Sequence, residues 1–518
     1  MLPESTNEWS HEEAAHLVKR SGFGGSPSRI AVVHEMGRDA ALEAIFTGTE
    51  GVSLPPPEWT DEETGKVERR ERVDFLRGLR RNEEGLDPAE IDRMRRQFNQ
   101  KHGRRDRLRQ AELASWWFGR MIHSPCPLRE KMVLFWHDHF ATSFRKVKQP
   151  QLLYSQNELF RQHAFGDARA LTHAILRDRA MMAYLDTQNS KKGSPNENFA
   201  REVMELFTLG EGHYTEQDIR EAARAFTGYQ FNPLTDQVIH RRRRWDDGPK
   251  TIFGRTGNFD GDEVIDLLFE QPAAAEYIPS KLWAFFVEDT PPTAVVKELA
   301  KTFRESGFQV EAVLREIFRS RAFYDSSVRG NQIKSPIQFL AQMCQELELD
   351  GLPPAYFASS SQQLGQVLFQ PPNVAGWDWG KAWINTNTLL SRYNIAGVVT
   401  TGSSNPKGMS GSGEADDMMM EAAENAGQGG AMLARIVKRS MSRWSGPDYE
   451  SIAPRPLREN PEKLVDHLIE RLFQSRVGSK ERASFIEYAR AKKGVIFTNH
   501  EVAELCHLMM STPRYQLC

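Results

Sequence analysis

The sequence has few cysteines and no long hydrophobic runs. Its 518 residues include only four cysteines, and none of them belongs to a CxxC pair: Cys126, Cys344, Cys506 and Cys518. This spacing argues against a thiolate zinc site and against a dense disulfide framework. No stretch approaches the ~18 uninterrupted apolar residues that a membrane-spanning helix needs, so no membrane span is predicted.

The sequence also lacks an excess of charge of one sign. Lys and Arg total 67 while Asp and Glu total 70, which leaves a net charge of −3. This balance gives no reason to expect a nucleic acid as partner. Residues 1–9 contain no basic region followed by an apolar one and no twin-arginine pair, so no export signal is seen. As written, the chain is predicted to be cytoplasmic, and export together with a partner protein stays open.

Alternating strand patterns and the common catalytic motifs are scarce. There is no G-x-S-x-G elbow and no H-E-x-x-H helix, and residues 250–257 lack the Gly-Lys-Ser/Thr order of a P-loop. Helical periodicity, by contrast, is clear over 128–140, 198–209 and 310–320. We therefore predict a mainly α fold: a large multi-helix single core with a helical C-terminal module and little or no sheet.

The composition along the chain suggests five parts. We expect an N-terminal helical segment (1–60), a charged helical arm (61–110), a helical core with the candidate site (111–400), a low-complexity linker (401–430) and a helical module packed on the core (431–518). Acids are interleaved with the arginines of the arm, and no aromatic platform accompanies them. The arm is therefore interpreted as a solvated helical hairpin rather than a nucleic-acid surface.

The first candidate for chemistry is the run Phe135-Trp136-His137-Asp138-His139-Phe140. On a helix, side chains two positions apart point about 200° apart, so His137 and His139 should not both bind one metal ion. The aromatic neighbours would desolvate the imidazoles, which tunes a histidine for acid–base work. Histidines that pack or hydrogen-bond in the core are the preferred alternative.

The second candidate is a polar stripe on the helix predicted after Pro195. Asn198, Glu202 and Glu205 occupy positions i, i+4 and i+7 and therefore share one helix face, and Arg201 lies beside them. Two carboxylates and an amide suit a divalent cation, or a general base oriented by an arginine. A salt-bridge network that ties helices together explains the same pattern, and both interpretations stay open.

Two loops complete the set. Gly210 is expected to end the helix of the stripe, and Thr215 with Asp218 forms a capping-box pattern for the next helix. The loop between them places His213 near the start of the next predicted helix. Loops on rigid scaffolds often carry catalytic residues, so His213 is a candidate, although a purely structural loop fits as well.

The other loop contains three tryptophans, Trp377, Trp379 and Trp383, after the segment Gln370-Pro371-Pro372-Asn373-Val374-Ala375-Gly376. Exposed indoles could stack on carbohydrate. A rigid loop that closes one end of the helical core is the preferred interpretation.

Several of these blocks occur in a recognisable order. They are His16–Gly24, Leu128–Lys131 followed by Phe135–Phe140, Asn198–Gly212, Lys334-Ser335-Pro336, Pro371–Trp377 and Leu508–Gln516. Together they resemble the large bacterial family known as domain of unknown function 1800, over nearly the whole chain. The family is uncharacterised, so the resemblance implies no catalytic residues. Members often occur beside a second uncharacterised family that resembles alkaline phosphatases and sulfatases, frequently in exported settings, and this implies a partner protein of that kind.

The leading hypothesis is an enzyme with a polar site that uses a divalent metal ion. It assigns catalysis to His137, His139, Arg201 and His213, and metal binding to Asn198, Glu202 and Glu205. One alternative is a structural or secretion-accessory protein that works with a partner protein. The other is a carbohydrate-binding protein that uses the Trp-rich loop. Convergence of the His and Glu side chains on an open cleft favours the enzyme, and complete pairing inside a closed core favours the scaffold.

Overall fold

The computed structural model describes residues 1–48, 51–82, 87–232, 235, 237–402, 428–473, 476–492 and 496–518. Over these residues the chain is mainly α-helical, and its strands form only two small two-stranded sheets. The predicted fold class is therefore confirmed. Residues 403–427 of the predicted linker lie outside the described residues.

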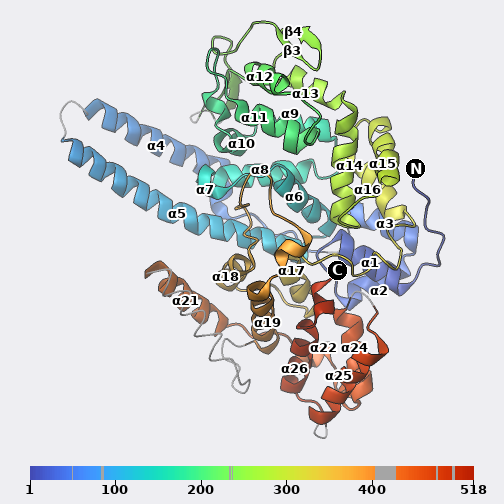
Figure 1. Cartoon of the computed structure of the whole chain (residues 1–518). Helices are drawn as coiled ribbons and strands as arrows, with labels where there is room; N and C mark the ends of the chain where they lie inside the picture. The colour runs from blue at the N-terminus through green and yellow to red at the C-terminus, as the bar shows by residue number, and fades with distance from the viewer. Residues whose placement is uncertain are drawn as a thin grey trace.

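The chain begins with three helices of the body and continues into a long helical hairpin (Figure 1). The first elements are α1 (His11–Ser21), α2 (Pro27–Glu35), α3 (Arg38–Thr47) and the 3-10 turn η1 (Glu58–Thr60). The hairpin consists of α4 (Glu62–Asn82) and α5 (Pro88–His123), which lie side by side and extend away from the body.

The hairpin is held together by side chains of both helices. Phe75 of α4 stacks on Phe98 of α5, with 3.9 Å between ring centroids. Asp87 caps α5 by accepting the N–H of Ala89 at 3.2 Å. The last turns of α5 enter the body, where Trp117 is completely buried. One helix thus belongs both to the hairpin and to the core.

The middle of the chain forms most of the body. Its elements are α6 (Pro127–His139), α7 (Phe144–Val147), α8 (Pro150–Gln162), α9 (Ala168–Leu176), α10 (Arg179–Tyr184), η2 (Thr187–Asn189), α11 (Glu197–Glu202), the π-helix η3 (Val203–Thr208), α12 (Glu216–Ala225), α13 (Gly261–Phe269), α14 (Pro272–Phe286), α15 (Thr293–Glu305) and α16 (Val310–Arg319). Between α12 and α13 lie two antiparallel pairs, β1 (Tyr229–Asn232) with β2 (Gln237–His240) and β3 (Lys250–Ile252) with β4 (Arg255–Gly257). The segment 250–257 is thus a β-hairpin.

The last third of the chain returns to the core. Its elements are α17 (Pro336–Glu346), α18 (Pro354–Leu364), η4 (Gly380–Trp383), α19 (Thr386–Thr401), α21 (Gln428–Met441), α22 (Tyr449–Ile452), α23 (Arg455–Arg458), α24 (Pro461–Leu472), α25 (Ser479–Lys492), α26 (Asn499–Met510) and η5 (Pro513–Gln516). The last residues pair with the segment before α17: Cys518 N–H donates to Gln332 O at 2.8 Å, and Lys334 N–H donates to Gln516 O at 2.8 Å. No helix in the described part of the chain combines the length and the apolar composition needed to cross a membrane.

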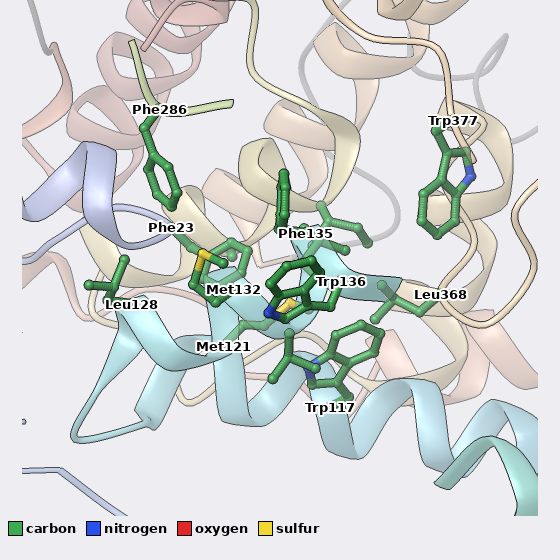
Figure 2. Close-up of a cluster of buried hydrophobic side chains, with 14 of the residues drawn as sticks. Phe23, Trp117, Met121, Leu128, Met132, Phe135, Trp136, Phe286, Leu368 and Trp377 are labelled. Carbon is green, nitrogen blue, oxygen red and sulfur yellow. The ribbon is translucent and has the colours of Figure 1, made fainter. Parts of the chain in front are cut away.

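Helix α6 lies at the centre of the hydrophobic core. Figure 2 shows its side chains Leu128, Met132, Phe135 and Trp136 among buried residues of α5, α14 and the loops. Every residue of α6 except Arg129 is buried, including the charged Glu130, Lys131 and Asp138. Burial on all sides means that the polar side chains of α6 must find their partners inside the protein.

Candidate functional site

The His-Asp-His run forms the last turn of α6 and is buried. The ring of His137 lies against Trp117 and Phe369, with centroid distances of 5.4 and 5.3 Å. The ring of His139 lies against Phe207 at 6.0 Å. The two imidazoles thus have different neighbours, as expected for positions two apart on a helix.

Burial holds both histidines in the neutral form. Desolvation lowers the pKa of His137 to about 3. It lowers the pKa of His139 well below its usual value, and the nearby Lys281 charge acts in the same direction. His139 Nε2 hydrogen-bonds the carbonyl oxygen of Phe207 at 3.0 Å, which assigns the proton to that nitrogen. Near pH 7 neither ring carries a charge for acid catalysis.

Asp138, between the two histidines, joins α6 to the Trp-rich loop. Its carboxylate accepts the backbone N–H of Trp377 at 2.7 Å and the indole N–H of Trp379 at 2.9 Å. Burial nevertheless raises the pKa of Asp138 to about 6. Gly376 adopts φ +88°, and a Cβ atom there would lie 2.3 Å from Asp138 Oδ1. The glycine therefore allows the loop to reach the carboxylate.

The helix that carries the polar stripe changes its geometry along its length. α11 is an α-helix only to Glu202, and residues 203–208 form the π-helix η3. Its wider turn is closed by the bond from Leu209 N–H to Met204 O at 2.9 Å. The regular i, i+4, i+7 spacing assumed from the sequence thus ends at Glu202. π-helical turns are frequent at functional sites.

Side chains of the π-helix itself and of neighbouring elements bind its carbonyl oxygens. The donors are Thr208 Oγ1 to Val203 O, Tyr277 Oη to Leu206 O at 3.0 Å and His139 Nε2 to Phe207 O at 3.0 Å. The tertiary bonds from α6 and α14 therefore stabilise the widened turn. They also connect the His-Asp-His run with the polar stripe.

The two carboxylates of the stripe are half-buried, whereas Asn198 is exposed. Glu205 accepts the hydroxyl of Tyr214 at 2.6 Å. Burial and the neighbouring charge of Glu205 raise the pKa of Glu202. The stripe therefore brings two negatively charged side chains close together near the surface.

The two remaining predicted catalytic residues lie apart from the buried histidines. Arg201 donates two bonds to Glu216 of α12, at 2.8 and 2.9 Å, and this ion pair ties α11 to α12. His213 is exposed in the loop before α12. The predicted end of the helix at Gly210, with φ +81°, and the capping box of Thr215 with Asp218 are both confirmed.

The three tryptophans differ in exposure. Trp377 and Trp383 are buried in the core, and Trp379 is 38% exposed. The indole nitrogen of Trp379 is bound to Asp138. The loop therefore presents one partly exposed indole rather than three.

A set of buried cations was missed at the sequence level. Burial lowers the pKa of Lys131 to about 8 and that of Lys334 to about 7. Both lie near other buried cations of the core, Lys19, Arg20 and Arg392. Lys131 Nζ donates to Gln338 Oε1 at 2.9 Å, and Lys334 Nζ lies 3.7 Å from the ring centroid of Tyr515. The sequence feature that could have indicated their burial is the apolar residue that adjoins each lysine, in the Leu-Arg-Glu-Lys and Lys-Ser-Pro blocks.

No group of three or more His, Cys, Asp or Glu side chains within the described ranges is arranged to hold a metal ion. Asp138, which links two of the candidate motifs, was also missed, because its partners lie more than 200 residues away. A pocket beside α4 and α5 is lined by none of the predicted site residues.

These contacts define a mainly α-helical protein in which a buried His-Asp-His turn, a π-helix and a Trp-rich loop form one connected unit. The chain matches the family model described as "Protein of unknown function (DUF1800)" over residues 16–517, and it belongs to that family. No curated protein and no solved structure matches the chain.

We expect Gly376→Ala to destabilise the protein more than Gly365→Ala. Both glycines have nearly the same φ, +88° and +87°, but an added Cβ meets Asp138 only at position 376, and nothing lies within 4 Å at position 365. The left-handed strain alone costs about 1 kcal/mol, and lost bonds to the buried carboxylate should bring Gly376→Ala to about 3 kcal/mol. Urea denaturation measures the unfolding free energy of both variants. Equal decreases in the two variants would show that the loop does not depend on the contact between Gly376 and Asp138.

Asp138→Asn should change the pH dependence of stability. The folded pKa of Asp138, about 6, lies above the ordinary value of 3.8, so the native state holds the proton more tightly. As the pH rises from about 4 to 6, the unfolding free energy of the wild type should therefore fall, relative to that of the variant, by about 3 kcal/mol in total. Denaturation curves at several pH values measure this difference. Asp92→Asn, at an exposed position, is the control, and a flat difference for Asp138→Asn would contradict the assignment.

Proposed function

We propose that the protein is a partner-binding scaffold and that the α4–α5 hairpin is its docking element. The observation that carries this proposal is the hairpin itself, which extends away from the body (Figure 1). Val67 and Leu108 on it are 65% and 66% exposed. Leu79 and Ile91 of its outer part are buried but do not belong to the hydrophobic core cluster of the body, so the folding of the body does not account for its length.

The engagement of two of the four candidate catalytic groups supports the same proposal. His139 binds a backbone carbonyl and Arg201 binds Glu216, and Asp138, between the two histidines, binds the Trp-rich loop. Groups that are engaged in this way are not available to a substrate without breaking tertiary contacts. The family resemblance suggests that the partner is a protein related to alkaline phosphatases and sulfatases.

Site-specific photo-crosslinking in the native host tests the docking element. A photoreactive amino acid at Leu76 or Leu108 should crosslink the same protein, identified by mass spectrometry. Leu389 on α19 is similarly exposed and lies outside the hairpin, so it is the matched control. The proposal fails if the two hairpin positions give no common product, or if Leu389 gives the same one.

A second candidate function is a divalent-cation or acid–base site at Glu202 and Glu205. The favouring observation is the raised pKa of Glu202, which arises from burial and from the neighbouring Glu205 charge. A divalent cation would relieve this repulsion, and Asn198 could add an amide oxygen. In this proposal Arg201 is a positioning residue, because it fixes α11 against α12 through Glu216. His213, exposed in the adjoining loop, would be the acid–base group. The buried His139 would support the π-helix through its bond to Phe207 O, and His137 packs against Trp117 and Phe369.

Calorimetric titration with Mg²⁺, Mn²⁺ and Ca²⁺ tests the second candidate. We expect saturable binding with a Kd of about 1 mM or lower, weakened at least about tenfold in Glu202→Gln/Glu205→Gln. The control Glu211→Gln/Glu276→Gln removes the same charge from exposed positions nearby. Equal weakening in both double variants, or no saturation in the wild type, would exclude a cation site here.

A further inference from the structure

The hairpin meets the body at a pocket that none of the motifs above explains. The pocket is partly open, with about 520 Å³ of space that includes open solvent, and is lined by residues of α4, α5 and the start of α8. It therefore forms only because three segments far apart in the sequence come together.

The walls of this pocket carry an excess of positive charge. Four arginines line it with only two carboxylates, Glu68 and Asp106: Arg69, Arg72, Arg105 and Arg109. Glu68 is shared between Arg109 at 2.7 Å and Arg105 at 3.1 Å. Burial also raises the pKa of Asp106, which disfavours its negative charge. The pocket wall therefore holds more guanidinium groups than carboxylates.

The start of α8 adds to the positive potential. Gln149, Pro150 and Gln151 line the pocket at the N-terminal end of this 13-residue helix. Gln149, at the N-cap, makes no side-chain capping bond. The N-terminal end of a helix carries a partial positive charge that favours anions. At the start of α8 this charge is the contribution, because Pro150 has no N–H and Leu152 N–H donates to Gln149 O at 3.1 Å. Three elements therefore present positive charge to one space.

Several of these groups are held in place before any ligand binds. The guanidinium of Arg109 lies 5.2 Å from the ring centroid of Trp59, a buried residue whose indole N–H donates to Glu112 at 2.8 Å. Gln151 Nε2 donates to Thr60 O at 2.7 Å, which fixes α8 against the segment before α4. Preorganised side chains lower the entropic cost of binding.

We propose that this pocket binds a tetrahedral oxyanion of the phosphate or sulfate type, either free or as the end group of a small organic molecule. Guanidinium groups match such oxyanions because their N–H donors form paired, charge-assisted hydrogen bonds. The pocket is a ligand site additional to the docking role of the hairpin, and it does not depend on that role.

Isothermal titration calorimetry on the full chain tests the site, with inorganic phosphate, sulfate and glycerol phosphate as probes and glycerol as the uncharged control. The buffer should contain little salt, because salt screens exposed charges. We expect saturable binding of the anions and none of glycerol. Tighter binding of glycerol phosphate than of phosphate indicates an organic carrier, and equal binding indicates a free ion. Failure of all three anions to saturate below about 20 mM overturns the proposal.

The double variant Arg72→Gln/Arg105→Gln should weaken anion binding at least about tenfold. Its matched control is Arg104→Gln/Arg107→Gln, which removes the same charge from exposed positions of α5 outside the pocket and should leave binding unchanged. If both double variants bind the anion equally weakly, the anion is attracted by the general charge of the hairpin and the proposed site is overturned. If circular dichroism shows that the first variant is unfolded, Arg72→Gln alone, at an exposed position, should still weaken binding severalfold, and unchanged binding would overturn the proposal.

Discussion

The structure depends on the need to satisfy polar side chains on a helix that is buried on every side. α6 carries Glu130, Lys131, Asp138 and His139 into the core. Each such group would destabilise the fold if it lost its partner, because an unpaired buried charge or donor costs several kcal/mol. The chain meets this requirement with partners from many different elements.

Those partners determine how the rest of the body is arranged. Glu130 accepts bonds from Arg120 of α5 at 3.0 Å and Arg161 of α8 at 2.8 Å. Lys131 reaches α17, Asp138 reaches the Trp-rich loop and His139 reaches the π-helix. A buried ion pair adds little net stability compared with apolar packing, but breaking one partner is costly. In this protein the buried polar contacts of α6 therefore act mainly by selecting one arrangement of α5, α8, α17 and the loops.

The pairing of polar side chains also distinguishes the interior of the protein from the surfaces that are available for a ligand or a partner. Asp138 and His139 Nε2 are hydrogen-bonded within the chain, whereas Glu202 and Glu205 are half-buried near the surface. The hairpin is different again, since ion pairs such as Lys66–Glu62, Arg77–Asp74 and Lys101–Glu71 are largely exposed and only its base approaches the body. Internal specificity and external binding thus occupy different parts of the molecule.

Local sequence determined the features whose causes are local. Helical periodicity predicted the mainly α class, and Thr215 with Asp218 and Gly210 marked a helix start and a helix end, because capping bonds join residues only a few positions apart. The π-helix could not be predicted in this way, since its carbonyls are bound by His139 and Tyr277 from other helices. The role of Asp138 depended on Trp377 and Trp379, and the cationic pocket depended on α4, α5 and α8 meeting. Tertiary structure alone decided these features, because hydrogen bonds and electrostatic potential depend on distance in space and not on separation along the chain.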